Sequence, residues 1–466
     1  MDDPTVDRQQ ITEHLSEAVK FRTISYPADF DPKEFMSLHG YLERAFPRVH
    51  QELKKQTVGE YSLLYTWKGE QEALNPVLLM AHMDVYRVRP GTEQSWTYPP
   101  FSGHVADGYI WGRGTLDYKV GLLAALEAVE ALLRQGLPMR RTLHLSFGHD
   151  EEIGGGGAVE VAELLRARGT HLDGVVDEGM SITDGIVPGV SQPVALIGLS
   201  EKGLALVELS VESPEAGHSM AAPQHTAIGI LSAAVKRLEE NRFPARIDGP
   251  TRDMIRALAP EMPPVSRVAL SNLWLFGGLV SRQFAKSPAT NAVIRTTSNT
   301  TVFIGGDHPG SVPMEARAIL RLSILPGESI ATTIEYVRRL IDDPRVGIKP
   351  FDWNTLGIRG FNSEPSPVSS VKSPIFAALK QTIQQVFPDV LIAPGLVIAA
   401  TDSRHFVDLS DNIFRFCPFR LGPGDIARIH GVDERIPIDD YERIVKFYIR
   451  LMRNWAEHDE VSAGGN

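Results

Sequence analysis

The sequence has little cysteine, no long apolar run and no excess of positive charge. Cys417 is the single cysteine among 466 residues, so no internal disulfide can form and the usual sign of an oxidising compartment is missing. No apolar run approaches the ~18 residues that a membrane span requires. The formal net charge of -11, without clustered Lys and Arg, argues against a nucleic-acid partner. The N-terminal stretch has no basic and apolar leader, so we expect a cytoplasmic protein.

The length exceeds what one hydrophobic core usually organises, which predicts at least two domains. In the first part, apolar strand-like runs such as "NPVLLMAHMDV" and "RRTLHLSFGHD" alternate with helical segments. One of these segments, "VGLLAALEAVEALLRQG", has apolar positions at helical spacing and stops at Gly136. This alternation predicts an α/β domain with a mainly parallel sheet and helices on both faces.

The pattern changes after Leu199. "KGLALVELSVES" alternates with period two, as a half-exposed antiparallel strand does, and begins the first of two strand-helix units, which are separated by irregular apolar sequence up to about Arg295. They predict a small α+β domain inserted into the first. We therefore expect one domain built from residues 1–198 and 362–466, and an inserted domain at 199–361.

Strands of open α/β sheets deliver functional groups at their carboxyl ends, where this chain has several acidic and imidazole side chains. They are His82, Asp84, Asp117, Glu151, Glu152, Asp177 and His430. Two imidazoles with several carboxylates, and no thiolate, form a ligand set suited to zinc, with cobalt or manganese as alternatives.

His82 and Asp84 are two apart, so in a strand their side chains share one face. His82 could then bind a metal through one ring nitrogen while Asp84 accepts a hydrogen bond from the other. A buried structural His-Asp pair is the alternative. Glu151 and Glu152 point in opposite directions in an extended chain, so one could serve the metal and the other could accept a proton from metal-activated water. A solvated acidic turn is the alternative there.

Several motifs occur together in the chain. They are "AHMDV", "GRGTLDYK", "GHDEEIGGGGA", "VVDEG", "GHS" from Gly217, "TDSRHF" and "RIHGVDE". Their order and spacing resemble the di-zinc metallopeptidase family of carboxypeptidase S, aminoacylases and glutamate carboxypeptidase over nearly the whole chain. The branch of this family that condenses and hydrolyses N-fatty-acyl amino acids is the most similar one in three segments: "SEKG", residues Ala269 to Phe276, and "NAVIRTT".

The resemblance implies two Zn²⁺ ions about 3.5 Å apart, bridged by Asp117. It implies that His82 and Asp177 complete one site and that Glu152 and His430 complete the other. Glu151 becomes the general base and later the acid for the leaving amine, supported by Asp84 beside His82. The inserted domain becomes a lid of the dimerisation type, and His218 within it would stabilise the oxyanion. A homodimer through this domain is the expected assembly.

The substrate-side predictions concern two places. Arg404, in "TDSRHF", lies where the family places substrate-binding groups, so it could clamp a carboxylate or instead form a structural ion pair. The text from Ser271 to Ala285 is rich in large apolar residues, and Phe276 and Leu279 within it could receive an acyl chain. Packing onto the core of the inserted domain is the alternative.

Some positions depart from the family pattern. Gly310 and Ser323 stand where an Asn and an Arg that bind substrate are usual, with Arg321 as a possible compensation for the latter. Tyr118 replaces a second acid after the bridging Asp117. These changes leave the metal ligands intact and bear on substrate choice.

The sequence therefore predicts a metal-dependent amidohydrolase that cleaves, and reversibly forms, the amide bond of small N-acyl amino acids. A carboxypeptidase or dipeptidase acting on short peptides is the nearest alternative. A non-catalytic binding protein on a peptidase scaffold is the alternative from another class.

Overall fold

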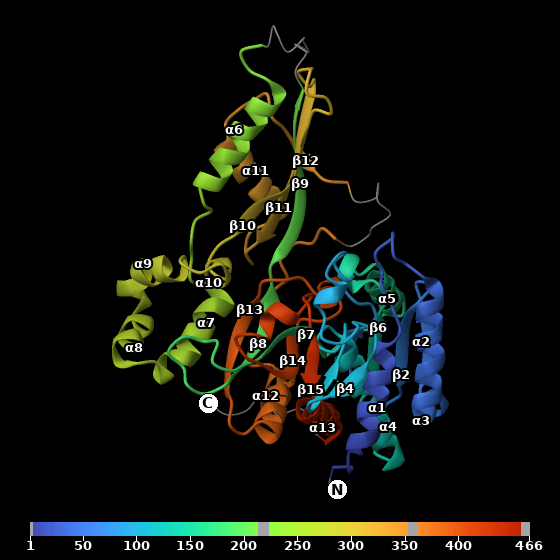
Figure 1. Ribbon diagram of the computed structural model, residues 1–466. Coiled ribbons are helices and arrows are strands. Elements are labelled where there is room, and N and C mark those ends of the chain that lie inside the picture. The colour runs from blue at the N-terminus through green and yellow to red at the C-terminus, as the bar shows by residue number, and fades with distance from the viewer. Residues whose placement is uncertain (1–2, 213–222, 353–360, 458–466) are drawn as a thin grey trace.

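The computed structural model describes residues 3–212, 223–352 and 361–457. Figure 1 shows a large α/β domain at the bottom of the view and a smaller, elongated domain above it. The chain passes from the large domain into the small one and returns. The α/β class with an inserted α+β domain is therefore confirmed.

The large domain contains an eight-stranded sheet in the order β1-β2-β6-β3-β7-β14-β8-β13. The strands are β1 (Lys54–Val58), β2 (Ser62–Trp67), β3 (Val77–His82), β6 (Leu143–Gly148), β7 (Gly174–Thr183), β8 (Val194–Glu201), β13 (Leu391–Val397) and β14 (Ile413–Leu421). Pairs β3–β6, β3–β7, β7–β14 and β8–β13 are parallel, whereas β1–β2 and β2–β6 are antiparallel. The sheet is thus mixed but mainly parallel.

Helices cover both faces of this sheet, and β3 shows why. Val77, Leu79 and Ala81 belong to one apolar core, while Leu78 and Met80 belong to another on the opposite face. The first core is closed by helices α1 (Arg8–Val19), α2 (Pro32–Ala45), α4 (Lys119–Arg134), α12 (Pro374–Val386) and α13 (Ile438–Glu457), and the second by α5 (Gly156–Ala167). Because a strand sends successive side chains to opposite faces, a strand covered on both sides reads as one continuous apolar run.

Shorter elements complete the large domain. They are α3 (Pro47–Glu52) and a small sheet in the order β15-β5-β4, made of β4 (His104–Ala106), β5 (Tyr109–Trp111) and β15 (Arg435–Pro437). The pairing of β15 with β5 brings the C-terminal motif "RIHGVDE" next to "GRGTLDYK". Two motifs more than 300 residues apart therefore meet.

The inserted domain has a four-stranded antiparallel sheet in the order β10-β11-β9-β12. Its strands are β9 (Gly203–Glu212), β10 (Thr297–Gly305), β11 (Glu315–Ile324) and β12 (Gly347–Pro350), and helices α6 (Ala227–Glu240) and α11 (Ile330–Ile341) pack on it. Buried and less buried residues alternate along β11, as expected for a sheet with one covered face. The domain has an apolar core of its own.

The segment expected to be irregular, before Arg295, is helical, so that expectation was wrong. It forms α7 (Gly249–Leu258), α8 (Pro264–Ser271), α9 (Leu273–Phe284) and α10 (Pro288–Ala292). Prolines stand in the first turn of α7, α8 and α10, where their fixed φ and missing N–H are tolerated. These prolines divide the apolar pattern into pieces too short to show helical periodicity.

Candidate metal centre

The candidate site lies at the carboxyl ends of three neighbouring strands. β3 ends at His82, which pairs with Gly148 at the end of β6, and β7 runs parallel to β3 on its other side. The turn after β6 forms a short 3-10 helix, Glu151–Ile153. The sheet order β6-β3-β7 therefore brings side chains from distant parts of the sequence to one edge.

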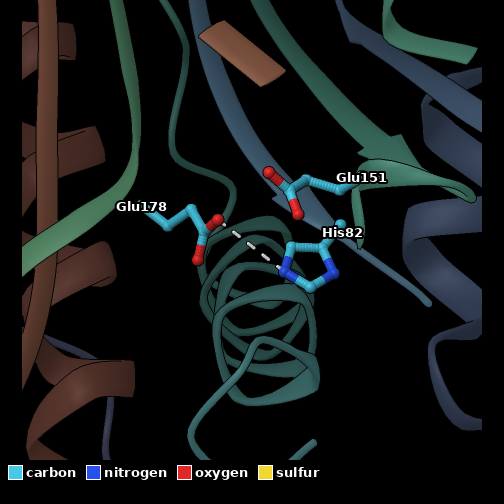
Figure 2. Close-up of side chains that lie close together, drawn as sticks. All are labelled: His82, Glu151 and Glu178. Atoms are coloured by element: carbon cyan, nitrogen blue, oxygen red, sulfur yellow. Dashed lines mark ion pairs between the residues drawn. The ribbon is translucent and has the colours of Figure 1, made fainter. Parts of the chain in front are cut away.

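Three of these side chains form an inner group, His82, Glu151 and Glu178. One ligand atom of each lies within 4.8 Å of the others, and His82 Nε2 is 3.8 Å from Glu178 Oε1. Figure 2 shows the imidazole and both carboxylates converging on a common space. His82 is only 1% exposed, so the inner group is enclosed by the fold.

An outer group consists of Asp117, Glu152 and His430, again with ligand atoms within 4.8 Å of one another. His430 Nε2 lies 2.7 Å from Asp117 Oδ2 and 3.3 Å from Glu152 Oε2. The His430 side chain is 40% exposed, which places this group toward solvent. Glu151 and Glu152 thus belong to different groups, and a 3-10 turn, not the extended chain assumed from the sequence, separates their side chains.

Asp117 joins the two groups. Its Oδ1 is 3.1 Å from His82 Nε2, while its Oδ2 faces His430. The loop before it is fixed by buried Glu434, which accepts the backbone N–H groups of Gly114, Leu116 and Asp117. This is the arrangement expected of a carboxylate that bridges two metal ions.

Asp84 organises the inner side of the centre. It is fully buried and accepts hydrogen bonds from the backbone N–H groups of Glu151 and Glu152, both at 3.1 Å, and from Ser25 Oγ at 2.6 Å. Its Oδ1 lies 3.3 Å from His82 Nδ1, which is also 2.9 Å from the Asp84 carbonyl oxygen. A proton held on Nδ1 leaves Nε2 free to bind a metal.

The electrostatics of the centre favour bound cations. Burial, with Glu178 nearby, raises the pKa of Glu151 well above its ordinary value, and burial with Asp117 does the same to the pKa of Glu178. Burial and Asp117 raise the pKa of Glu152 to about 7. Burial alone would lower the pKa of His430, but Asp117 and Glu152 raise it to about 10. Crowded, desolvated carboxylates of this kind are costly unless positive charge is added.

The donor atoms fit metal ions. Glu152 Oε1 is buried and has no hydrogen-bond partner among the described residues, as a coordinating oxygen awaiting a metal would. Imidazole nitrogens and carboxylate oxygens, without a thiolate in either group, match zinc and also cobalt or manganese. The residues present therefore suit two adjoining metal ions that share Asp117.

The structure favours Glu178, and not the predicted Asp177, as the ligand supplied by β7. The Asp177 carboxylate accepts the backbone N–H groups of Ser403, at 2.8 Å, and of Glu178, at 2.9 Å. Its side chain therefore faces the "TDSRHF" turn and lies outside both groups. Adjacent strand residues point in opposite directions, and the sequence "DEG" does not reveal which of the two faces the metals.

The Arg404 side chain forms hydrogen bonds within the large domain. Its two terminal nitrogens donate to the carbonyl oxygens of Thr401, at 2.7 Å, and Gly154, at 2.8 Å, and the residue is 8% exposed. The geometry of Arg404 thus favours a structural role over a substrate clamp. Backbone carbonyls, and not the carboxylate of an ion pair, are the groups that Arg404 binds. The guanidinium holds the "TDSRHF" turn against the glycine-rich turn after Glu152.

Of the remaining predicted residues, the structure places Phe276 and Leu279 away from the metal centre. His218 lies outside the described residues. Phe276 and Leu279 belong to α9, beyond edge strand β13, while the metal-binding groups lie on β3, β6 and β7 with two strands between. The Leu279 side chain is 62% exposed, so no enclosed acyl pocket surrounds it among the described residues.

Sequence reasoning missed two supports of the histidines. Tyr86 stacks on His430 with ring centroids 4.1 Å apart and planes at 11°. Tyr118, noted as a departure, is buried, its hydroxyl 3.0 Å from that of Tyr448 and its ring 6.2 Å from that of His82. Tyr86 follows Asp84 by two residues, but both lie after the end of β3, so strand alternation could not place Tyr86 against His430.

The fold and the site define a class of protein: a metal-dependent hydrolase that acts on amide or peptide bonds. The model of the peptidase family M20/M25/M40 matches residues 78–454 of this chain. The chain belongs to this family, whose members depend on metals. No described helix is long and apolar enough to cross a membrane.

Sequence relatives agree with this assignment, and a solved structure shares the fold. The chain is 41% identical over 457 residues to a probable carboxypeptidase S-like 2 of Dictyostelium discoideum, covering 97% of this chain and 86% of that protein. It is 39% identical to the human N-fatty-acyl-amino acid synthase/hydrolase PM20D1, covering 96% and 88%. The fold is similar to the metallo-carboxypeptidase Sso-CP2 of Sulfolobus solfataricus, with a TM-score of 0.69, 18% identity and coverage of 97% and 100%.

Proposed function

We propose that this protein hydrolyses, and by microscopic reversibility forms, the amide bond of N-acyl amino acids with apolar acyl groups. The observation that carries the chemistry is the position of Glu151, which shares the enclosed space of the inner group while Asp84 fixes its backbone. The substrate class is supported by relatives named N-fatty-acyl-amino acid synthase/hydrolase at 37–40% identity.

Two zinc ions are the proposed cofactors, with cobalt or manganese as substitutes. His82 and Glu178 would hold one ion, Glu152 and His430 the other, and Asp117 both. Metal ions in such a centre polarise the substrate carbonyl and lower the pKa of bound water to about 7. Fewer than one metal ion per purified chain, with no gain in activity on adding zinc, cobalt or manganese, would contradict this assignment and favour a non-catalytic scaffold.

Glu151 is the proposed proton carrier. It would take a proton from the attacking water and return it to the amine as the C–N bond breaks. Its raised pKa, caused by burial and then by Glu178, suits the second half of this task, because a carboxyl group that holds a proton can protonate a leaving amine. His218 stays the predicted oxyanion donor, and Arg321, exposed on β11, the predicted substitute for the usual arginine at position 323.

The nearest rival is a carboxypeptidase or dipeptidase, because relatives of both kinds share this fold. A panel pairs N-acetyl, N-octanoyl and N-oleoyl derivatives of phenylalanine and leucine with dipeptides of the same C-terminal residues. We expect kcat/KM for the long-chain acyl derivatives to exceed that for the dipeptides by about tenfold or more, since each buried methylene contributes about 0.8 kcal/mol. Faster cleavage of the dipeptides would establish the rival function.

A homodimer through the inserted domain is proposed as the assembly. Strand β10 is at the edge of its sheet, and Val302, Phe303 and Ile304 on it are 42%, 42% and 62% exposed. An exposed apolar edge strand is a ready surface for pairing with another chain. Replacing Ile304 by Lys should convert the dimer to a monomer in sedimentation velocity, whereas a wild-type monomer would contradict the proposal.

A further inference from the structure

Helices α8 and α9 form a hairpin with an unusual amount of exposed apolar surface. Val265 is 85% exposed, Val268 55%, Trp274 84%, Leu275 60% and Leu279 62%. Single exposed apolar side chains are normal on protein surfaces, but five within fifteen residues form a patch of the kind that marks an interaction site. In Figure 1 the hairpin projects from the side of the molecule, with α7 between it and β13, and lies away from α2.

The patch is a regular feature of the two helices. Val265 and Val268 are three residues apart on α8, and Leu275 and Leu279 are four apart on α9, so each pair lies on one side of its helix. Val280, next to Leu279, is 5% exposed and faces inward. The two helices pack on each other, and α8 also contacts α7, which in turn packs against β13. The hairpin is therefore attached to the large domain by one side while the other side is uncovered.

The charge around the patch is opposite to that of the whole protein. Residues 262–306 contain four basic residues, Arg267, Arg282, Lys286 and Arg295, and no acidic residue, in a chain with a net charge of -11. Arg267, Arg282 and Lys286 are exposed. This stretch is thus a basic and apolar island on an acidic protein, which indicates an anionic partner with an apolar interior.

A basic cavity adjoins the hairpin. It has a volume of about 340 Å³, lies between α6 and α10, and is lined by Arg242, Lys286 and Arg295, with Glu239 as the single acid in its lining. Lys286 is the second residue after the end of α9. An anionic headgroup could enter this cavity while the apolar side chains of the hairpin contact the acyl region beside it.

We propose that the α8–α9 hairpin docks on the surface of an anionic phospholipid bilayer. Amphipathic helices with Trp and Leu on one side and Arg and Lys beside them lie in the interface of membranes, and anionic lipids attract the cations. A second copy of this chain suits the surface less well, because a symmetric contact would place the same arginines and lysines opposite one another. The docking does not depend on the proposed substrate. Long-chain N-acyl amino acids would, however, be concentrated in the same lipid surface.

The test is sedimentation of the full chain with large unilamellar vesicles of phosphatidylcholine alone or with about a third phosphatidylglycerol. One variant removes apolar contact, Trp274→Ser/Leu275→Ser/Leu279→Ser, and another reverses charge, Arg282→Glu/Lys286→Glu. The matched apolar control, Met36→Ser/Val368→Ser/Val371→Ser, changes side chains that are 57%, 48% and 42% exposed on the large domain. The matched charge control is Lys372→Glu/Lys380→Glu, two exposed residues in and just before α12.

We expect the wild type and both controls to bind the anionic vesicles. Each hairpin variant should bind them with an affinity at least about tenfold lower, and its melting temperature should be unchanged. Added salt should release the wild type. Quenching of Trp274 by brominated lipid, measured as the difference from Trp274→Phe, should place this side chain in the acyl boundary. The proposal is overturned if the wild type does not bind anionic vesicles or if the hairpin variants bind them as well as the controls do. It is also overturned if the apolar variant only dissociates a dimer.

Discussion

The metal centre and the α8–α9 hairpin break the ordinary rule of burial in opposite ways. At the centre, the charged groups of His82 and Asp84 are buried and the Glu178 side chain is only 14% exposed, and each has partners that fix its position. On the hairpin, large apolar groups such as Trp274 and Leu279 are exposed and uncovered. Both arrangements cost stability, one through desolvated charge and the other through hydrated apolar surface. A protein keeps such costs where it binds something, so the two regions indicate two kinds of ligand: cations and an apolar, anionic surface.

The largest effect is expected from Glu151→Gln at the buried region. The amide cannot carry the proton, so kcat should fall by about 10²- to 10⁴-fold, while bound metal stays close to the wild-type amount because His82 and Glu178 are unchanged. Steady-state kinetics and metal analysis on the same preparation measure both. Glu163→Gln on the exposed side of α5 is the matched control. A variant that retains a tenth or more of the wild-type kcat would show that Glu151 is not the base.

A second prediction separates Glu178 from Asp177. Glu178→Gln removes a charged oxygen of the inner group and should weaken metal binding by about 100-fold or more, measured by competition with a chelator. Asp177→Asn keeps the inner group and weakens the hydrogen bonds from the backbone N–H groups of Ser403 and Glu178, so metal affinity should change by less than about tenfold while the melting temperature falls. The reverse order of affinities would restore Asp177 as the ligand.

The smallest effect concerns Lys202, at the junction between the two domains. It is 2% exposed, and its Nζ donates to the carbonyl oxygens of Ala292, at 3.1 Å, and Arg295, at 2.9 Å, just after the hairpin. Burial lowers the pKa of Lys202 from 10.5 to about 7, and Glu328 opposes this only in part. Between pH 7 and 10.5 the unfolded chain then binds the extra proton, so folding stability rises with pH across this window. Below pH 7 the cost of the buried charge is fully present.

Lys202→Met removes this titration and leaves all other groups in place. The melting temperature of the wild type minus that of the variant should therefore rise by a few degrees from pH 7 to pH 9, and should stay level from pH 6 to pH 7. Differential scanning calorimetry at matched ionic strength measures it. Parallel curves over the whole range would mean that Lys202 has an ordinary pKa in the folded protein.

Much of the fold and of the site could be read from the sequence, because the relevant signals are local. The run ending at His82 is apolar on both faces of a buried strand, so its polar ending pointed to a site. The change from unbroken to alternating apolar pattern near Leu199 located the inserted sheet. The helices before Arg295 could not be predicted in this way, because prolines at the starts of three of them divide the apolar pattern into short pieces.

By itself, the sequence determined the class of chemistry: which side chains could hold metals, their order along the chain, and the family to which the chain belongs. Only the tertiary structure decided which of two adjacent acids faces the metals, and that Arg404 is occupied by backbone carbonyls. It also decided that Leu279 faces outward on α9 and not into the site. The physical reason is that residue type and periodicity are local properties. The direction of a side chain at a strand end, and what covers a helix face, depend on elements far away in the chain.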